Sequence, residues 1–246
     1  MSGPPGEAPA LTTPTGAASA TGSAMDLTIQ RALLGGAGEL QATMASIPAW
    51  AGAAGVRESD LQRALCNALR AQLGSVVAVE GPLPPGVKEC WAGWLGRVDV
   101  LARPSGSSEV YLETKLCVID VLYEAIWDAL KLALVTTLLE GASGYLIYGA
   151  PEEGWTARED RPIELFEDGS VGVSELLRDR HPNAWSWCLS GTKTTRPISL
   201  PAALRTEQVA SVRVHTPSSE WELRCVRVQG DAQGGWIKFD GDGWPQ

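Results

Sequence analysis

Residues 96–101 read Gly-Arg-Val-Asp-Val-Leu, and residues 110–116 read Val-Tyr-Leu-Glu-Thr-Lys-Leu. Both stretches alternate apolar and polar side chains and are rich in β-branched or aromatic residues, which predicts two short strands. Between them, residues 103–108 read Arg-Pro-Ser-Gly-Ser-Ser, the composition of a hairpin loop. The two strands are therefore expected to pair in the antiparallel sense.

Three charged side chains fall close together on this predicted hairpin. Alternate side chains of a strand point to the same side, so Glu113 and Lys115 share a face, and an antiparallel neighbour can bring Asp99 beside them. Two carboxylates and one ammonium held together are costly unless their charge is compensated. A divalent cation compensates it, so the pattern predicts a Mg²⁺-dependent phosphodiesterase site.

Helices and strands flank the hairpin on both sides. Residues 59–73 carry leucines at helical spacing, with Ser59 as the expected N-cap. Residues 76–80 predict a strand before the hairpin, whereas residues 121–140 predict a long apolar helix after it. Residues 144–149 are strongly apolar and predict the next strand. This order predicts an α/β fold, a mixed sheet with helices on both faces.

Asp99 and the triplet Glu113-x-Lys115, set between helices in this order, resemble the motif of the PD-(D/E)XK nuclease superfamily. The family order is helix, strand, Asp-bearing strand, Glu-x-Lys strand, helix and strand, which here covers roughly residues 57–150. Val98 stands where the family often has proline. The resemblance implies a restriction-endonuclease-like mixed sheet and a metal-dependent endonuclease activity.

The resemblance also implies a role for each site residue. Asp99 and Glu113 are expected to bind Mg²⁺, for which Mn²⁺ can substitute, with the backbone carbonyl of Thr114 as a third ligand. Lys115 is expected to orient or deprotonate the attacking water and to offset charge on the phosphate. Glu58, near the start of the first helix, matches the position from which many family members contribute another acid.

Other residues compete for places at this site. Asp60 and Glu80 are alternatives to Glu58, although a role at the positive end of the helix also explains Asp60. A polar stripe at spacings i, i+4 and i+7 on the helix after the triplet faces either solvent or the site: Glu124, Asp128 and Lys131. The plain alternative for the whole motif is a surface hairpin with an Asp and a Glu/Lys pair.

The chain divides into three predicted parts. Residues 1–25 are dominated by Ala, Gly, Pro, Ser and Thr and predict a disordered leader. Residues 26–190 are expected to form the nuclease-like core, and residues 191–246 a small β-rich C-terminal extension of short strands. Basic residues of that extension include Lys193, Arg196, Arg205, Arg213, Arg224 and Arg227. Scattered solubilising charge explains them better than a nucleic-acid surface does.

Two local patterns give further predictions. Helical spacing runs from Met25 to Met44, but a glycine-rich stretch at residues 35–38 is expected to interrupt it. Residues 163–171 predict a hairpin with a tight Asp-Gly turn.

The bulk composition limits the class of protein. A chain of 246 residues with 44% hydrophobic and 20% charged residues can build a full hydrophobic core. Its five cysteines form no CxxC pair, which argues against a zinc site or a disulfide framework and favours a reducing compartment. No secretory signal and no membrane-spanning run is found, so we expect a cytoplasmic protein that does not enter a membrane.

The formal net charge of −9 opposes nucleic-acid binding, which depends on Lys and Arg contacts to phosphates. Either a narrow basic groove or a protein partner that supplies DNA grip or activation is therefore expected. Two functions stay open. The resemblance implies a Mg²⁺-dependent endonuclease that cleaves phosphodiester bonds in DNA, in genome defence or repair, often as a homodimer. The alternative is a catalytically idle nuclease-fold subunit that binds or scaffolds a larger complex.

Overall fold

The computed structural model describes residues 11–12, 23–46, 57–73, 76–90, 96–104, 108–116, 123–155, 162–184, 198–215 and 220–239. Most of the predicted leader, residues 1–25, lies outside these segments, and its disorder stays a prediction. None of the helices in these segments combines the length and the apolar character needed to cross a lipid bilayer.

Helices and strands alternate along most of the chain. In order they are β1 (Leu11–Thr12), α1 (Ala24–Ser46), α2 (Glu58–Leu73), β2 (Val76–Pro82), α3 (Pro85–Cys90), β3 (Arg97–Arg103), β4 (Val110–Leu116), α4 (Tyr123–Leu138), β5 (Ser143–Pro151), η2 (Glu152–Trp155), η3 (Ile163–Phe166), β6 (Gly169–Gly172), η4 (Glu175–Arg180), β7 (Ile198–His215) and β8 (Glu220–Phe239).

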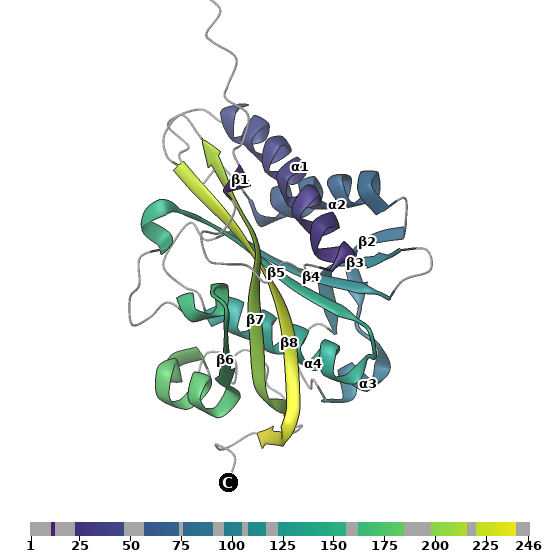
Figure 1. Cartoon of the computed structure of the whole chain (residues 1–246), viewed down its shortest axis with the longest axis vertical. Coiled ribbons are helices and arrows are strands. Elements are labelled where there is room, and N and C mark those ends of the chain that lie inside the picture. The colour runs from purple at the N-terminus through teal and green to yellow at the C-terminus, as the bar shows by residue number, and fades with distance from the viewer. Residues whose placement is uncertain are drawn as a thin grey trace, which may run out of the picture.

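One mixed sheet forms the centre of the molecule (Figure 1). Its strand order is β1-β7-β8-β5-β4-β3-β2, and β6 pairs with β7 beside this path. Neighbouring strands are antiparallel except β4 and β5, which are parallel and connected through α4. A parallel pair needs a crossover connection, and an apolar helix that packs on the sheet supplies it. The predicted α/β class, with a mixed sheet and flanking helices, is confirmed.

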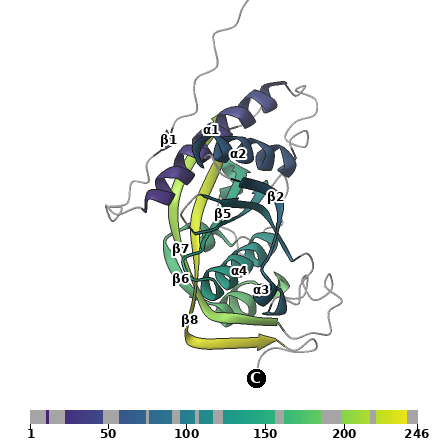
Figure 2. The ribbon, with the colours of Figure 1, turned by 90° about the vertical axis from the view of Figure 1, so that its right-hand side faces the viewer.

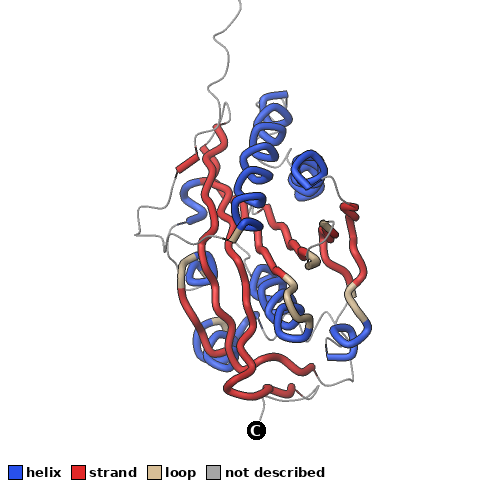
Figure 3. Tube along the Cα trace, turned by 45° about the vertical axis from the view of Figure 1, so that its right-hand side comes forward, coloured by secondary structure: helices blue, strands red, loops and turns tan. Residues whose placement is uncertain are grey.

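Helices cover both faces of this sheet, with α1 and α2 on one side and α4 on the other (Figures 2 and 3). On the first side, Leu33 and Leu65 pack into one hydrophobic cluster with Leu112 of β4. On the second side, Leu130 of α4 packs with Leu146 of β5. Because side chains of a strand alternate between faces, β3, β4, β5, β7 and β8 each contribute to both cores. The strand ends near α2 and α4 therefore lie between two packed layers.

Helix α2 follows the predicted leucine stripe, since Leu61, Leu65 and Leu69 are buried. Its start differs from the prediction, because the helix begins at Glu58 rather than after a Ser59 cap. The Asp60 carboxylate accepts a hydrogen bond from the Arg57 amide at 3.0 Å and thereby satisfies a donor at the helix start.

Helix α1 continues through the glycines that were expected to interrupt it. The reason is close packing against α2: a Cβ on Gly36 would lie 3.1 Å from Leu65 Cδ2 and 3.4 Å from the Leu65 amide nitrogen. The absence of a side chain therefore allows the two helices to approach each other.

The prediction of a hairpin over residues 163–171 is wrong. Residues Ile163–Phe166 form the 3₁₀ helix η3, whose Leu165 and Phe166 are buried in the core on the α4 side. Strand β6 follows the Asp-Gly turn but pairs with residues 203–206 of β7. Burial of the two apolar side chains outweighs the local preference for a hairpin.

The C-terminal segment is β-rich as predicted, but it is not a small separate extension. Its expected short strands are parts of β7 and β8, which span 18 and 20 residues. Strand β8 pairs with β5 over residues 221–228, so the segment completes the central sheet. Single-sequence patterns give the strand character of this region but not its partner, which is about 80 residues away in sequence.

Gly230→Ala is expected to lower the free energy of unfolding by about 1–3 kcal/mol, the usual cost of overpacking. A Cβ at Gly230 would lie 2.1 Å from Thr137 Oγ1 and 2.2 Å from the Ala133 carbonyl oxygen, so α4 would have to shift. Urea denaturation measures the change. Gly169→Ala is the matched control, because a Cβ there meets nothing within 4 Å. Equal stability of both variants would contradict the close α4–β8 contact.

Candidate active site

The sheet divides between β3 and β4 at the predicted motif. Backbone pairing of these strands ends at Val100 and Leu112, whereas β3 stays paired with β2 and β4 with β5 beyond that point. The Asp99 carboxylate fills the opening: its Oδ2 accepts hydrogen bonds from the Thr114 amide at 2.7 Å and the Thr114 hydroxyl at 2.9 Å. The motif aspartate is therefore held in a fixed orientation where the two strands separate.

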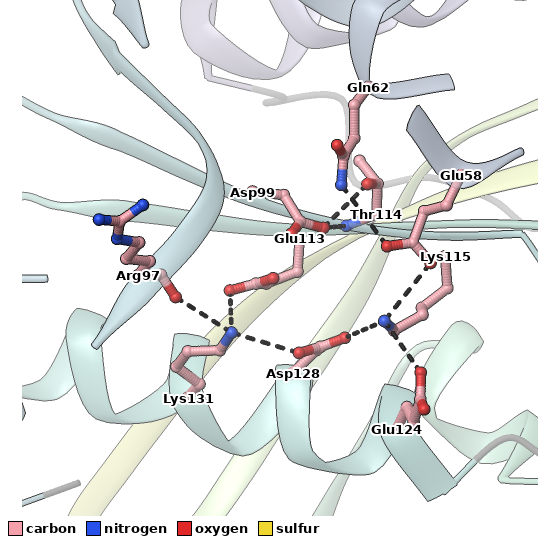
Figure 4. Close-up of polar contacts among 10 residues, drawn as sticks. All are labelled: Glu58, Gln62, Arg97, Asp99, Glu113, Thr114, Lys115, Glu124, Asp128 and Lys131. Carbon is pink, nitrogen blue, oxygen red and sulfur yellow. Dashed lines mark hydrogen bonds and ion pairs between the residues drawn. The ribbon is translucent and has the colours of Figure 1, made fainter. Parts of the chain in front are cut away.

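Glu113 points from β4 toward α4 and is almost fully buried, with 2% of its side chain exposed. The ammonium of Lys131 lies against its Oε1 (Figure 4). That ammonium also lies 3.3 Å from Asp128 Oδ1 and donates to the Arg97 carbonyl oxygen at 3.3 Å. A lysine from the polar stripe of α4 thus contacts the motif glutamate directly.

Lys115 connects the two helical layers at the same site. Its ammonium lies 3.4 Å from Glu58 Oε2 on α2, 3.0 Å from Glu124 Oε2 and 3.8 Å from Asp128 Oδ2 on α4. Gln62, one turn after Glu58, donates to Glu58 Oε1 at 3.5 Å (Figure 4). The opening between the strands therefore brings residues from both sides of the sheet together.

Most of the predicted residues meet in this cluster. The members named before are Glu58, Asp99, Glu113, Thr114, Lys115, Glu124, Asp128 and Lys131, and their catalytic roles stay predictions. Asp60 and Glu80 do not join it. Asp60 caps α2 and pairs with Arg63 at 2.9 Å, and the half-exposed Glu80 lies 3.9 Å from Arg97. Helical spacing from Glu58 would have singled out Gln62, which the sequence analysis missed.

Negative charge exceeds positive charge in the cluster. Five carboxylates surround two ammonium groups, so carboxylates outnumber them by three when all are ionised. Burial, reinforced by Asp99 and Asp128, raises the pKa of Glu58 to about 7 despite the opposing effect of Lys115. Burial and the charge of Asp128 raise the pKa of Glu113 well above its usual range. The cluster is thus short of positive charge.

The pKa values of the two lysines are raised as well, which favours their charged form. Burial alone would lower the pKa of Lys115, but Asp128, Glu58 and Glu124 outweigh it and raise that pKa. The pKa of Lys131 is likewise raised, because Glu113 and Asp128 outweigh its burial. Both side chains therefore carry a positive charge at neutral pH.

Two carboxylate oxygens of the cluster are fully buried. Within the described residues, Glu113 Oε1 and Asp128 Oδ2 make no hydrogen bond of acceptable geometry, although an ammonium lies beside each. The same part of the chain holds no ready group of three His, Cys, Asp or Glu side chains for a metal. The motif offers two carboxylates and one carbonyl, all hard oxygen donors, in a cluster that lacks positive charge. These donors fit Mg²⁺ or Mn²⁺.

The basic side chains of the C-terminal strands are largely paired with acids. Arg213 lies 3.1 Å from Glu220 and Arg224 lies 2.9 Å from Glu222, and Arg227 binds an aspartate of α1. Lys193 and Arg196 lie outside the described residues. The paired arginines are better suited to hold the sheet together than to bind phosphates.

Comparison with known proteins gives no match: no family model matches the chain, and neither a curated protein nor a solved structure does.

In the wild type, ionisation of Glu58 is expected to lower the free energy of unfolding as the pH rises from about 5 to about 8. The Glu58→Gln variant is expected to show a smaller decrease over the same range. The folded-state pKa of Glu58 is raised from 4.5 to about 7, so its stabilising contribution is full below pH 4.5 and is lost as the pH rises through about 7. Glutamine cannot ionise and removes this loss. Urea denaturation with a chelator present measures it, and Glu140→Gln, at an exposed position, is the control. An unchanged pH dependence would contradict the shift.

Proposed function

We propose that this chain is a Mg²⁺-dependent phosphodiesterase of the PD-(D/E)XK type that cleaves DNA. The observation that carries the proposal is the meeting of Asp99, Glu113 and Lys115 at the opening between β3 and β4, with Glu58 reaching them from α2. Apart from the short helix α3 between β2 and β3, the order α2, β2, β3, β4, α4, β5 also matches the order that the family resemblance implies. Parallel β4 and β5 support a restriction-endonuclease-like core.

The contacts of each residue support a separate role for it in the reaction. Asp99 and Glu113 are the residues that would hold Mg²⁺, with the Thr114 carbonyl as the proposed third ligand, and the Thr114 amide and hydroxyl fix the Asp99 carboxylate through two hydrogen bonds. Bound Mg²⁺ supplies charge relief on the phosphate and a more acidic water. Three carboxylates keep Lys115 charged, so it is suited to orient water and to offset phosphate charge rather than to remove a proton.

A second candidate is an inactive nuclease-fold subunit that binds or scaffolds a partner. Two observations favour it: Lys131 lies against Glu113, and the described arginines of β8 are paired with acids. A homodimer or a partner that supplies the DNA grip would agree with the net charge of −9 under either proposal. Genome defence or repair remains the proposed setting.

A substrate panel separates the two candidates. Supercoiled plasmid, linear duplex, single-stranded DNA and RNA are each incubated with the protein and Mg²⁺, Mn²⁺ or a chelator. Cleavage of DNA with either metal and none with the chelator is expected. Binding without cleavage of any substrate would favour the inactive subunit, and cleavage that persists with the chelator would contradict the metal-dependent site.

A further inference from the structure

Lys131 is the one buried cation of the cluster to which the proposed mechanism gives no role. Only 13% of its side chain is exposed, and its ammonium contacts three oxygen atoms, from Glu113, Asp128 and the Arg97 backbone. A lysine at this depth is costly unless its charge is compensated. Its surroundings, two carboxylates and one carbonyl, are also those that a hard metal cation prefers.

From these contacts, and on the basis of the metal-dependent function proposed above, we propose that Lys131 is an internal counter-cation. Its ammonium occupies the cation position beside Glu113 in the metal-free protein, and a divalent cation displaces it from that carboxylate. Lys131 is thus a positioning residue that sets the affinity for metal, and it competes with the metal for Glu113.

The geometry allows this exchange without unfolding α4. When the contact with Glu113 is lost, the ammonium keeps Asp128 Oδ1 and the Arg97 carbonyl oxygen, each at 3.3 Å. The lysine stem has four flexible carbons, which permits a small movement of the charged group.

The charge balance favours the exchange. With Lys131 in place the carboxylates still outnumber the ammonium groups by three. A divalent cation adds two positive charges while Lys131 stays within the cluster beside Asp128, so the deficit shrinks. In the absence of metal, Lys131 keeps Glu113 from being a buried carboxylate with no cation beside it.

Titration calorimetry with Mg²⁺ and with Mn²⁺ tests the proposal on the wild type and on Lys131→Met. Methionine keeps an unbranched apolar stem but removes the charge, so the metal no longer competes with an ammonium. We expect metal to bind about tenfold more tightly, the loss of one charge-assisted contact. Lys131→Arg, which keeps the charge, and Lys238→Met, which removes an exposed charge on β8, are expected to bind as the wild type does. Equal or weaker binding by folded Lys131→Met would overturn the proposal.

A failure of the metal site itself gives a different result. If neither the wild type nor Lys131→Met binds either metal, the proposed function fails together with the exchange. If both bind metal with the same affinity, only the role of Lys131 fails.

A second measurement follows Lys131 directly in the wild-type protein. The side-chain ¹⁵Nζ resonance of Lys131, assigned with the Lys131→Arg variant, is followed during a Mg²⁺ titration of the wild type. We expect it to shift with the same midpoint as the calorimetric titration. A resonance that stays unchanged while the metal binds would overturn the proposal.

Discussion

Lys115→Met is expected to lower the single-turnover rate of Mg²⁺-dependent DNA cleavage by about 10²–10³-fold, the usual cost of removing one group that stabilises the charge developing in the transition state. Its ammonium lies within 4 Å of carboxylates from both α2 and α4, at the point where the strands separate. Methionine fills the same space but can neither orient water nor offset charge on the phosphate. Mg²⁺ binding is expected to persist, because the carboxylates of Asp99 and Glu113 remain.

Two controls accompany this variant. Lys115→Arg keeps the charge and is expected to recover part of the rate, whereas Lys238→Met removes a distant exposed charge and is expected to leave the rate unchanged. Circular dichroism establishes that each variant is folded. A rate for Lys115→Met within a few-fold of the wild type would contradict its role in the reaction.

Asp26→Ala is expected to lower the free energy of unfolding by about 3–5 kcal/mol, the cost of breaking a buried ion pair by removing one partner. Asp26 is 3% exposed and lies at the start of α1. Its carboxylate accepts hydrogen bonds from the Tyr145 hydroxyl at 2.9 Å, the Arg227 guanidinium at 3.0 Å and the Ser23 amide at 2.8 Å. Alanine removes all three and leaves Arg227 with Glu207 as its remaining acidic partner among the described residues.

Urea denaturation at neutral pH measures this loss. Glu220→Ala is the control, since Glu220 pairs with Arg213 at the protein surface, where an ion pair contributes about 0–1 kcal/mol. Comparable decreases in the free energy of unfolding for the two variants would show that Asp26 does not stabilise the packing of α1 on the sheet.

The motif hairpin and the elements around it could be predicted from sequence, because each depends on a local pattern. Alternation marks β3 and β4, the leucine spacing marks α2, and the apolar run marks α4. The polar stripe of α4 was also visible, but its spacing alone could not decide between solvent and the site. The structure turns Asp128 and Lys131 inward, where both are largely buried.

Other features depend on contacts between distant segments. The hydrogen bonds from Thr114 to Asp99 require the two strands to separate, and alternation does not reveal that separation. The contact between Lys131 and Glu113 depends on how α4 crosses the sheet. The Asp26 interactions join α1 to β5 and to β8, which follow it by 119 and 201 residues. Tertiary packing decides such contacts, so a single sequence does not contain a local signal for them.

The central claim is that Asp99 and Glu113 form a metal-dependent site for phosphodiester cleavage. The most direct test is single-turnover cleavage of supercoiled plasmid across a Mg²⁺ titration, with the wild type and the near-isosteric Glu113→Gln variant side by side. The account predicts saturable cleavage by the wild type and no detectable cleavage by folded Glu113→Gln at any Mg²⁺ concentration. Equal cleavage by the two proteins, or none by either on any nucleic-acid substrate, would contradict it.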